Sequence, residues 1–240
     1  MLALHPPDSV FSLRHMPSWL LPTCAAGCVN ATAVLVCGRY VTHVTGTVTR
    51  IGMEGARIAI VFDLMLVLLC FIAGALASGL ALNGRAHAGR RPLYALPLVC
   101  VALIDVAVAM AGWMGWFGAF GGTIDQPSDF VFLSSLSFAM GLQNGAVATS
   151  TGLLVRTTHL TGPATDLGIH LAELLVAKGP ARKAAWQHAL LRAGKIAAFA
   201  VGSAVAFTLA PTLEYLVLLI SAVVTLLATW VSFMRAQPAS

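Results

Sequence analysis

Six long apolar runs limit the folds open to this chain more than any other feature of its sequence. They lie at about residues 16–38, 58–82, 92–113, 130–155, 189–210 and 212–233, and each is near the roughly 20 residues that cross a bilayer as a helix. The runs show no strict alternation of apolar and polar residues, which disfavours a membrane β-barrel. Because 58% of the 240 residues are hydrophobic and only 10% are charged, the sequence predicts an all-α transmembrane protein, a six-helix bundle forming a single membrane domain over 1–240.

The basic residues predict how these helices are oriented. When the loops are counted from the first helix, only Arg39, Arg50 and Arg57 fall on one side of the membrane, and the other eleven Lys and Arg fall on the opposite side. The positive-inside rule then places both termini in the cytoplasm, in a multi-pass protein of the plasma (inner) membrane. Contact with anionic lipid headgroups explains the net charge of +5 without nucleic acid. The first run is too long for a signal peptide, so we expect it to be retained.

A polar phrase occurs twice, as THVTGTVTRIG at 42–52 and as THLTGPATDLG at 158–168. Upstream of the two copies AGCVNA aligns with MGLQNG, and downstream FIAGALA aligns with FAVGSAV. Each phrase follows the first run of a set of three, and since three is odd, the second set enters the membrane from the opposite side. The sequence therefore predicts an inverted-topology 3+3 repeat of residues 17–113 and 130–233, an arrangement that recurs among secondary transporters.

Other segments and residue types narrow the chemistry of the chain. Residues 173–188 are basic, include Trp186 and are too polar to cross, so we expect an interfacial cytoplasmic segment. The five cysteines lie within the apolar runs and are interpreted as packing residues, with no metal site and no cofactor. The chain has no phosphate-binding loop, HExxH helix or GxSxG elbow, and no nucleophile with a matching base, so we expect no enzyme.

Within the phrases, small and hydroxylated residues recur at helical spacing. Two interpretations stay open. Either the phrases are faces on which two helices pack closely, or a glycine or Gly-Pro pair breaks each helix and the freed groups bind a solute. The first copy of this face consists of Thr42, Thr45, Thr49 and Gly52; the second consists of Thr158, Thr161, Thr165 and Gly168; the expected breaks are at Gly46 and at Gly162-Pro163.

Charged and aromatic residues of the phrases also occupy matching positions. His43 and His159 share one position, where a structural role competes with a proton-linked one. Arg50 and Asp166 share another with opposite charge, so they are a candidate pair across the pseudo-symmetry axis if the halves bring the phrases together. A charge swap would test that pair.

Polar side chains inside apolar runs are costly in lipid and are candidates for function. Asp105 lies well inside the third run, whereas Asp63 is only a turn or two into the second. Asn30 lies in the first run and Gln143 and Asn144 lie at the matching place in the fourth. These amides are candidates for bonds between helices or to a substrate.

The stretch RTTHLTGPATDLGI from Arg156, preceded by FAMGLQNGAV from Phe138, resembles the second-half signature of the YoaK-like membrane proteins of the DUF1275 family. VTHVTGTVTRIG resembles their first-half signature, and the resemblance covers the chain from about Pro17 to the last run. It implies an integral membrane protein with six helices, chiefly bacterial, whose activity is not established.

This chain departs from the family pattern at three places. Many members carry Gly-x-x-Asp-Ala where this chain has GCVNA with Asn30, and Thr-Gly-Asn or Ser-Gly-Asn where it has Thr45-Gly46-Thr47. Arg50 stands where an Asp is common. If those acids carry protons or bind cations in relatives, this protein differs from them in that respect.

Two functional hypotheses follow. The first is a small secondary transporter or permease with a midplane site at the two THxTG phrases, Asn30, Asn144 and Asp105. The second is a non-transporting scaffold or lipid-binding protein whose phrases are helix-packing faces. Membrane lipids are the expected partners in both; a small-molecule solute belongs to the first, and a homodimer is left open. The first hypothesis requires the two asparagines and the threonines to converge on one central cavity.

Overall fold

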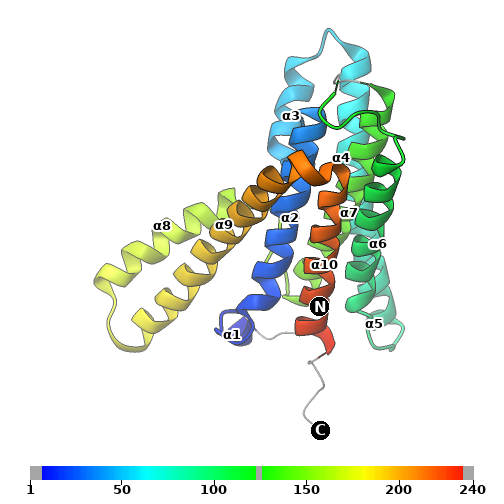
Figure 1. Ribbon diagram of the computed structural model, residues 1–240. Helices are drawn as coiled ribbons and strands as arrows, with labels where there is room; N and C mark the ends of the chain where they lie inside the picture. Colours follow the sequence, from blue (N-terminus) through cyan, green and yellow to red (C-terminus); the bar gives the residue numbers. More distant parts are fainter. Residues whose placement is uncertain (1–6, 123–125, 235–240) are drawn as a thin grey trace.

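The computed structural model describes residues 7–122 and 126–234, and these residues form helices and connecting loops with no β-strand among them (Figure 1). The order of the helices follows the apolar runs. They are α1 Pro7–Val10, α2 Met16–Cys37, α3 Val44–Met53, α4 Ile58–Gly79, a π-helical turn at Leu80–Gly84, α5 Arg85–His87, α6 Ala95–Trp113, α7 Pro127–Ser150, α8 Thr161–Val176, α9 Gly179–Leu213, a 3-10 turn at Glu214–Val217, α10 Leu218–Thr229 and a final π-helical turn at Trp230–Met234.

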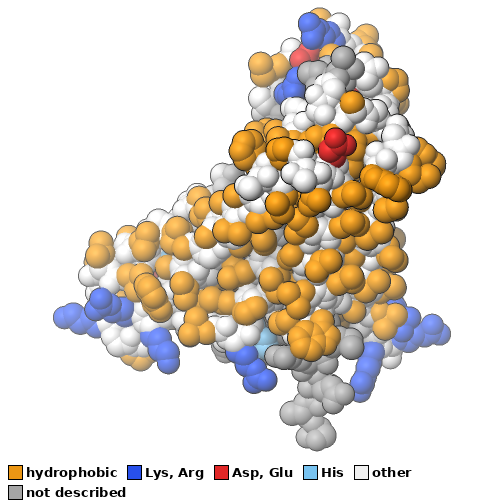
Figure 2. Space-filling model, viewed as in Figure 1, with side chains coloured by type: hydrophobic (Ala, Val, Ile, Leu, Met, Phe, Trp, Pro, Cys, Tyr) orange, Lys and Arg blue, Asp and Glu red, His pale blue; other side chains and the backbone are white. Residues whose placement is uncertain are grey.

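Five helical stretches of the described chain are long and apolar enough to cross a membrane. The last of them, Gly179–Ser232, contains both α9 and α10 and is not straight. The chain changes direction at Glu214, which has a positive φ of 49°, and α10 then runs back along α2 and α6 (Figure 1). Figure 2 shows hydrophobic side chains covering the face of these helices, with Lys and Arg along its lower edge and at its upper end. The all-helical, membrane-like architecture predicted from the apolar runs is confirmed.

Two helix boundaries differ from those predicted. Helix α7 ends at Ser150 and not near residue 155, because Gly152 and Leu153 both adopt a positive φ, of 60° and 71°. Helix α9 begins at Gly179, well before the predicted residue 189, and its first half packs against α8. The segment 173–188 is divided between two helices, since its first residues end α8 and its last residues belong to α9. That it lies at the cytoplasmic interface stays a prediction.

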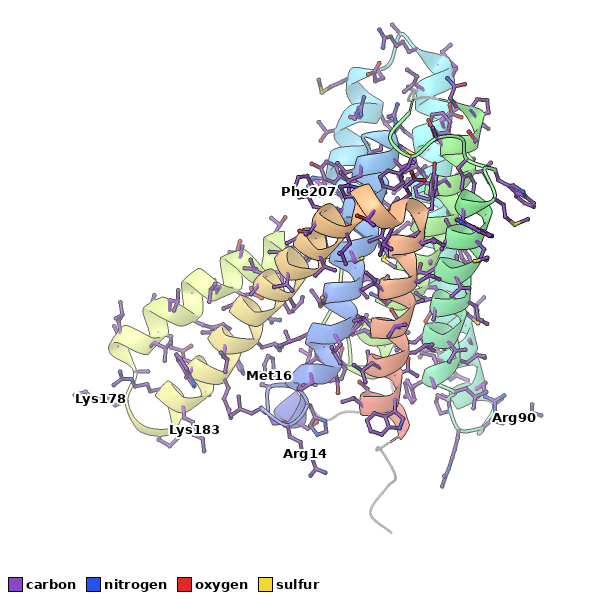
Figure 3. All side chains as sticks on the ribbon, viewed as in Figure 1. Arg14, Met16, Arg90, Lys178, Lys183 and Phe207 are labelled. Carbon is purple, nitrogen blue, oxygen red and sulfur yellow. The ribbon has the colours of Figure 1, made fainter. Side chains whose placement is uncertain are left out.

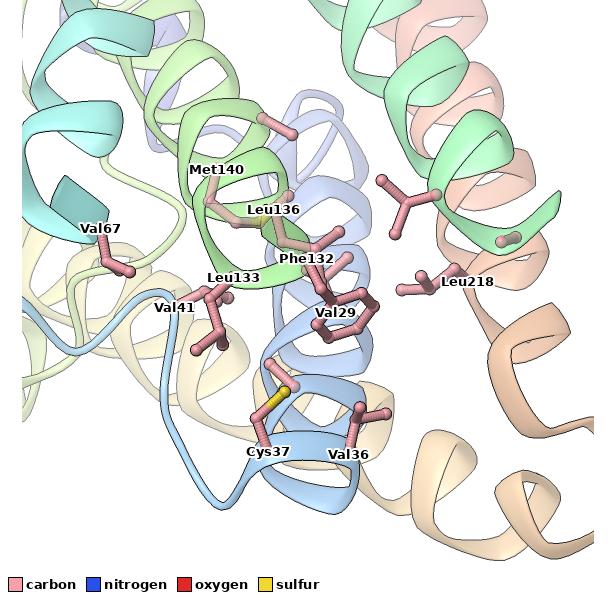
Figure 4. Close-up of a cluster of buried hydrophobic side chains, with 14 of the residues drawn as sticks. Val29, Val36, Cys37, Val41, Val67, Phe132, Leu133, Leu136, Met140 and Leu218 are labelled. Atoms are coloured by element: carbon pink, nitrogen blue, oxygen red, sulfur yellow. The ribbon is translucent and has the colours of Figure 1, made fainter. Parts of the chain in front are cut away.

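The helices of the two halves of the chain pack crosswise. Helix α2 lies against α9 and α10, whereas α7 lies against α4 and α6. The main buried core is formed by residues of α2, α6, α7 and α10, and it includes Val29, Phe132, Leu136, Met140 and Leu218 (Figure 4). Contacts between the halves thus supply much of the buried apolar surface.

Glycines bring α2 and α9 into backbone contact. A Cβ on Gly27 would overlap the carbonyl oxygen of Phe199, and a Cβ on Gly202 would overlap the carbonyl oxygen of Cys24. Only a hydrogen atom fits at either position, so the close approach of this helix pair depends on both glycines.

The pair formed by α4 and α7 repeats this arrangement. A Cβ on Gly74 would overlap the carbonyl oxygen of Phe138, and a Cβ on Gly141 would overlap that of Phe71. In the alignment of the two halves Gly27 corresponds to Gly141, and Gly74 corresponds to Gly202. Equivalent residues therefore make equivalent contacts in the two helix pairs.

Candidate functional site

The first THxTG phrase is held beside the middle of α2. Gly38 ends that helix in the left-handed conformation, with φ of 62°, and the following residues fold back along it. Thr42 consequently lies next to Asn30, whose Oδ1 accepts hydrogen bonds from the Thr42 backbone N (3.2 Å) and from its Oγ1 (2.8 Å). Helix α3 begins two residues later, at Val44.

The second phrase is held in the same way beside α7. After α7 ends at Ser150, residues 151–160 fold back, and the backbone N of Thr158 donates to Asn144 Oδ1 at 3.4 Å. Helix α8 then begins at Thr161. An asparagine in the first helix of each half thus fixes the start of the phrase that follows.

The predicted helix breaks at glycine are not present. Gly46 and Gly162-Pro163 lie inside the first turns of α3 and α8, where Pro163 replaces an N–H that needs no partner in the helix. The ring of His43 lies over Gly46, where a Cβ would overlap it, and a Cβ on Gly162 would come within 2.8 Å of the His159 ring. The glycines leave room for the histidine rings.

The threonine face predicted through both phrases is shorter than expected. Thr42 and Thr158 precede their helices, so the helical part of each face begins at the next threonine. The hydroxyls of Thr49 and Thr165 donate to carbonyl oxygens one turn earlier in their own helices, at 2.9 and 3.3 Å. The main packing partner of α3 is α4, and that of α8 is α9.

Both phrases open onto one cavity of about 770 Å³, and equivalent residues of the two halves line it. Eight of the predicted substrate-binding residues meet there: Asn30, Thr42, His43, Thr45, Asn144, Thr158, His159 and Thr161. Gly46, Thr49, Asp105, Gln143, Gly162 and Thr165 are not in its lining. That the cavity binds a substrate stays a prediction.

Several lining residues were missed by sequence reasoning. Phe71 and Phe199 face the cavity from α4 and α9, and Tyr40, Val44, Arg156 and Leu160 complete the wall. The two phenylalanines begin the aligned stretches FIAGALA and FAVGSAV, so their matching positions were a usable signal. Arg156 begins the second signature, but its charge alone indicates only a loop at the membrane surface.

One permanently charged side chain lines the cavity, and it is positive. This residue is Arg156; His43 and His159 also line the cavity, and no Asp or Glu is among its lining residues. Lys195, which is only 1% exposed, donates from Nζ to the backbone oxygen of His159 at 3.5 Å. The second phrase therefore has a buried cation directly behind it.

Asp105 and Gln143 connect helices and do not face this cavity. Asp105 Oδ2 accepts a hydrogen bond of 2.8 Å from Ser221 Oγ, which joins α6 to α10. Gln143 Nε2 donates to the carbonyl oxygen of Pro22 at 2.9 Å and to Thr157 Oγ1 at 3.1 Å. A polar residue inside an apolar run is compatible with either a bond between helices or a bond to a substrate, so the sequence alone does not distinguish the two roles.

The predicted pair of Arg50 with Asp166 is not formed. Arg50 lies 3.9 Å from Glu54 in its own helix, and Asp166 Oδ2 lies 3.2 Å from Arg192 Nε of α9. The two helices run away from the cavity in different directions (Figure 1), so residues one or two turns along them diverge.

Reversing the charge of Arg192 should destabilise the contact of α8 with α9. We expect Arg192→Asp to cost roughly 1 kcal/mol, or about 2–4 °C in melting temperature, and Asp166→Arg in the same chain to recover most of it. Arg50→Asp is the control, and its effect should not depend on Asp166. Thermal unfolding in detergent compares the wild type, Arg192→Asp, Arg50→Asp, and each of these two changes combined with Asp166→Arg. An Arg192→Asp, Asp166→Arg double variant no more stable than Arg192→Asp would contradict the pair.

The family described as protein of unknown function (DUF1275) matches the chain over residues 19–231. The match covers nearly the whole chain, including both phrases and every residue that lines the cavity. No curated protein and no solved structure matches the chain. The resemblance inferred from the two signatures is thus confirmed at the level of the family.

Proposed function

This chain belongs to the DUF1275 family, and on that premise we propose that it is a small secondary transporter or permease with its substrate site in the cavity between the THxTG phrases. One observation carries the proposal: equivalent residues from the two halves line a single space. Its volume of about 770 Å³ is within the range of small-molecule sites, roughly 300–1,000 Å³.

An inverted 3+3 repeat is part of this proposal. It counts α9 and α10 as separate crossings, which gives six membrane helices. The contacts of α2 with α9 and α10, matched by those of α7 with α4 and α6, support it. So do the equivalent glycine contacts and the equivalent bonds from Asn30 and Asn144. Secondary transporters commonly place their sites at the interface of such repeats.

The short helices α3 and α8 also fit this function. Each begins beside the middle of a long helix and follows a non-helical segment, residues 38–43 or 151–160. Backbone that is not helical is tolerated at membrane depth where it lines a water-filled cavity or is covered by protein. Transporters use such discontinuous helices to place free backbone groups around a substrate.

We propose the plasma (inner) membrane as the location, with both termini in the cytoplasm. Arg14, Arg90, Lys178 and Lys183 lie along one end of the molecule (Figure 3), as the positive-inside rule expects for a cytoplasmic face. Arg235, assigned to the same face from the sequence, is outside the described residues.

The alternative is a scaffold or lipid-binding protein whose phrases are only packing faces. It receives less support, because the hydroxyls of Thr49 and Thr165 bond within their own helices and other threonines line the cavity. Solute uptake distinguishes the two functions.

Filling the cavity should stop transport. In proteoliposomes we expect at least one member of a panel of amino acids, organic acids and aromatic solutes to enter faster than into protein-free liposomes. Thr161→Trp places an indole in the cavity wall and should reduce that uptake at least about tenfold, an energy of about 1.4 kcal/mol. Thr165→Trp is one turn further along α8, outside the lining, and should leave it unchanged.

Two results would count against transport. One is a panel in which no solute enters faster than into protein-free liposomes. The other is an uptake that Thr161→Trp and Thr165→Trp affect equally.

A further inference from the structure

We propose that the cavity binds a small organic anion, with the anionic oxygens held by the N-termini of α3 and α8 and by the Asn30 amide. The inference rests on the proposed function, because it names the ligand class of the same site. Free backbone donors, one amide nitrogen without a protein partner, the charge of the lining and its aromatic walls carry it.

The starts of α3 and α8 have backbone N–H groups without a protein acceptor. The first helical hydrogen bond of α3 runs from Thr47 N to the His43 oxygen (3.0 Å), and that of α8 runs from Ala164 N to the Leu160 oxygen (2.9 Å). The N–H groups just before these, at 44–46 and 161–162, donate to no protein atom in the described chain, and neither helix has a side-chain cap.

Three of these N–H groups, those of Val44, Thr45 and Thr161, belong to residues that line the cavity, whereas Gly46 and Gly162 are not in its lining. The N-terminus of a helix carries about half a positive charge, and free N–H groups there bind anions. Two such ends on one cavity give it two sets of donors for anionic oxygens.

Asn30 provides an independent indication of a ligand. Its side chain is 7% exposed and lines the cavity. Its Oδ1 accepts both hydrogen bonds from Thr42, whereas its Nδ2 donates to no atom of the described residues. Because Asn30 lines the cavity, its free Nδ2 is available as a donor there, and an oxygen of a bound anion would accept its hydrogen bond.

The charges around the cavity favour the same ligand class. Arg156 lines the cavity and no carboxylate does. Lys195 adds a buried positive charge behind His159. The nearest acid on α8, Asp166, is paired with Arg192, so its charge is partly offset.

The aromatic walls indicate that the anion has an organic body. Phe71 and Phe199 face the cavity from the two halves, and Tyr40 extends the aromatic lining. Inorganic phosphate would leave these rings without an apolar partner, whereas an aromatic or aliphatic carboxylate would cover them and place its oxygens at the helix ends. Anionic lipid headgroups share the oxygen chemistry, so the test needs a lipid arm.

Ligand binding to the purified full-length protein tests this inference. Thermal unfolding in detergent is measured with benzoate, phenylacetate and succinate, each matched by its uncharged amide, and separately with inorganic phosphate and phosphatidylglycerol. We expect at least one carboxylate to stabilise the protein with an apparent affinity at least about tenfold above that of its amide, as charge-assisted hydrogen bonds predict.

Two variants then locate the binding. Asn30→Asp keeps an oxygen for Thr42 but replaces the free donor by a negative charge, and should weaken the binding of that carboxylate at least about tenfold. Arg156→Gln, at an exposed side chain, should weaken it similarly without affecting folding. Arg90→Gln, at the end of the molecule (Figure 3), is the matched control and should bind like the wild type.

The inference is overturned if no carboxylate binds, if the amides bind equally well, or if Arg156→Gln and Arg90→Gln bind alike. Stabilisation by phosphatidylglycerol or inorganic phosphate alone would also overturn it. Its failure is distinguishable from that of the proposed function. Carboxylate binding without solute uptake would contradict transport only, whereas Thr161-dependent uptake of uncharged solutes without carboxylate binding would contradict the anion only.

Discussion

Replacing Gly202 by alanine should prevent stable packing of α9 on α2. The new Cβ would overlap the carbonyl oxygen of Cys24, and since backbone is on both sides, no flexible side chain is available to yield. The helices must separate, which removes apolar contacts along their whole length, and we expect a loss of roughly 3 kcal/mol. Gly74→Ala should act similarly between α4 and α7 because its Cβ would overlap the carbonyl oxygen of Phe138.

Gly79→Ala in the same helix as Gly74 is the matched control. A Cβ at Gly79 meets nothing within 4 Å, and alanine is the better helix former, so this variant should be at least as stable as the wild type. Thermal unfolding in detergent and the yield of monodisperse protein compare the three. A Gly202→Ala protein that melts with the wild type would show that the helix pair is less tightly packed than described.

Asn30→Leu should detach the start of α3 and abolish solute uptake. Leucine has nearly the same size but accepts no hydrogen bond, so the backbone N and the hydroxyl of Thr42, both buried, lose their acceptor. Unsatisfied buried donors cost about 1–3 kcal/mol each, and we expect a total of roughly 2–4 kcal/mol. The cavity would also lose one wall.

Asn144→Leu tests whether the two halves are held equally. Asn144 accepts one longer hydrogen bond, 3.4 Å from Thr158 N, so its loss should cost about 1 kcal/mol. Melting temperatures should therefore fall in the order wild type, Asn144→Leu, Asn30→Leu, whereas both variants should lose uptake. Equal destabilisation by the two changes would contradict the unequal hydrogen bonding.

The sequence was sufficient for the helical membrane class, because apolar length and the cost of unpaired backbone in lipid decide it without reference to packing. It also placed Asn30 and Asn144 with the threonines, since matching positions in two related halves predict matching places in space. The foldback at Gly38 was not predictable, because a positive φ at one glycine among 22 leaves no periodic signal. Without that foldback the phrases read as continuous helical faces.

Errors at Asp105, Gln143 and the Arg50 and Asp166 pair have a common origin. Burial marks a polar residue as constrained but does not distinguish a bond between helices from a bond to a ligand, and Asp105 and Gln143 form the former. The charge pair was inferred from equal positions in the phrases, whereas α3 and α8 diverge from their shared cavity and Asp166 meets Arg192. The direction in which α3 and α8 leave the cavity depends on the foldbacks before them, which matching positions in the sequence do not predict.

The crosswise packing has a consequence for how the protein is made. Helix α2 leaves the ribosome early, but its main partners, α9 and α10, are encoded in the last third of the chain. The face of α2 that contains Gly27 must remain in lipid or with an insertion factor until nearly all of the polypeptide has been synthesised. Neither half then folds by itself, because the early helices can complete their packing only after the last helices have been synthesised.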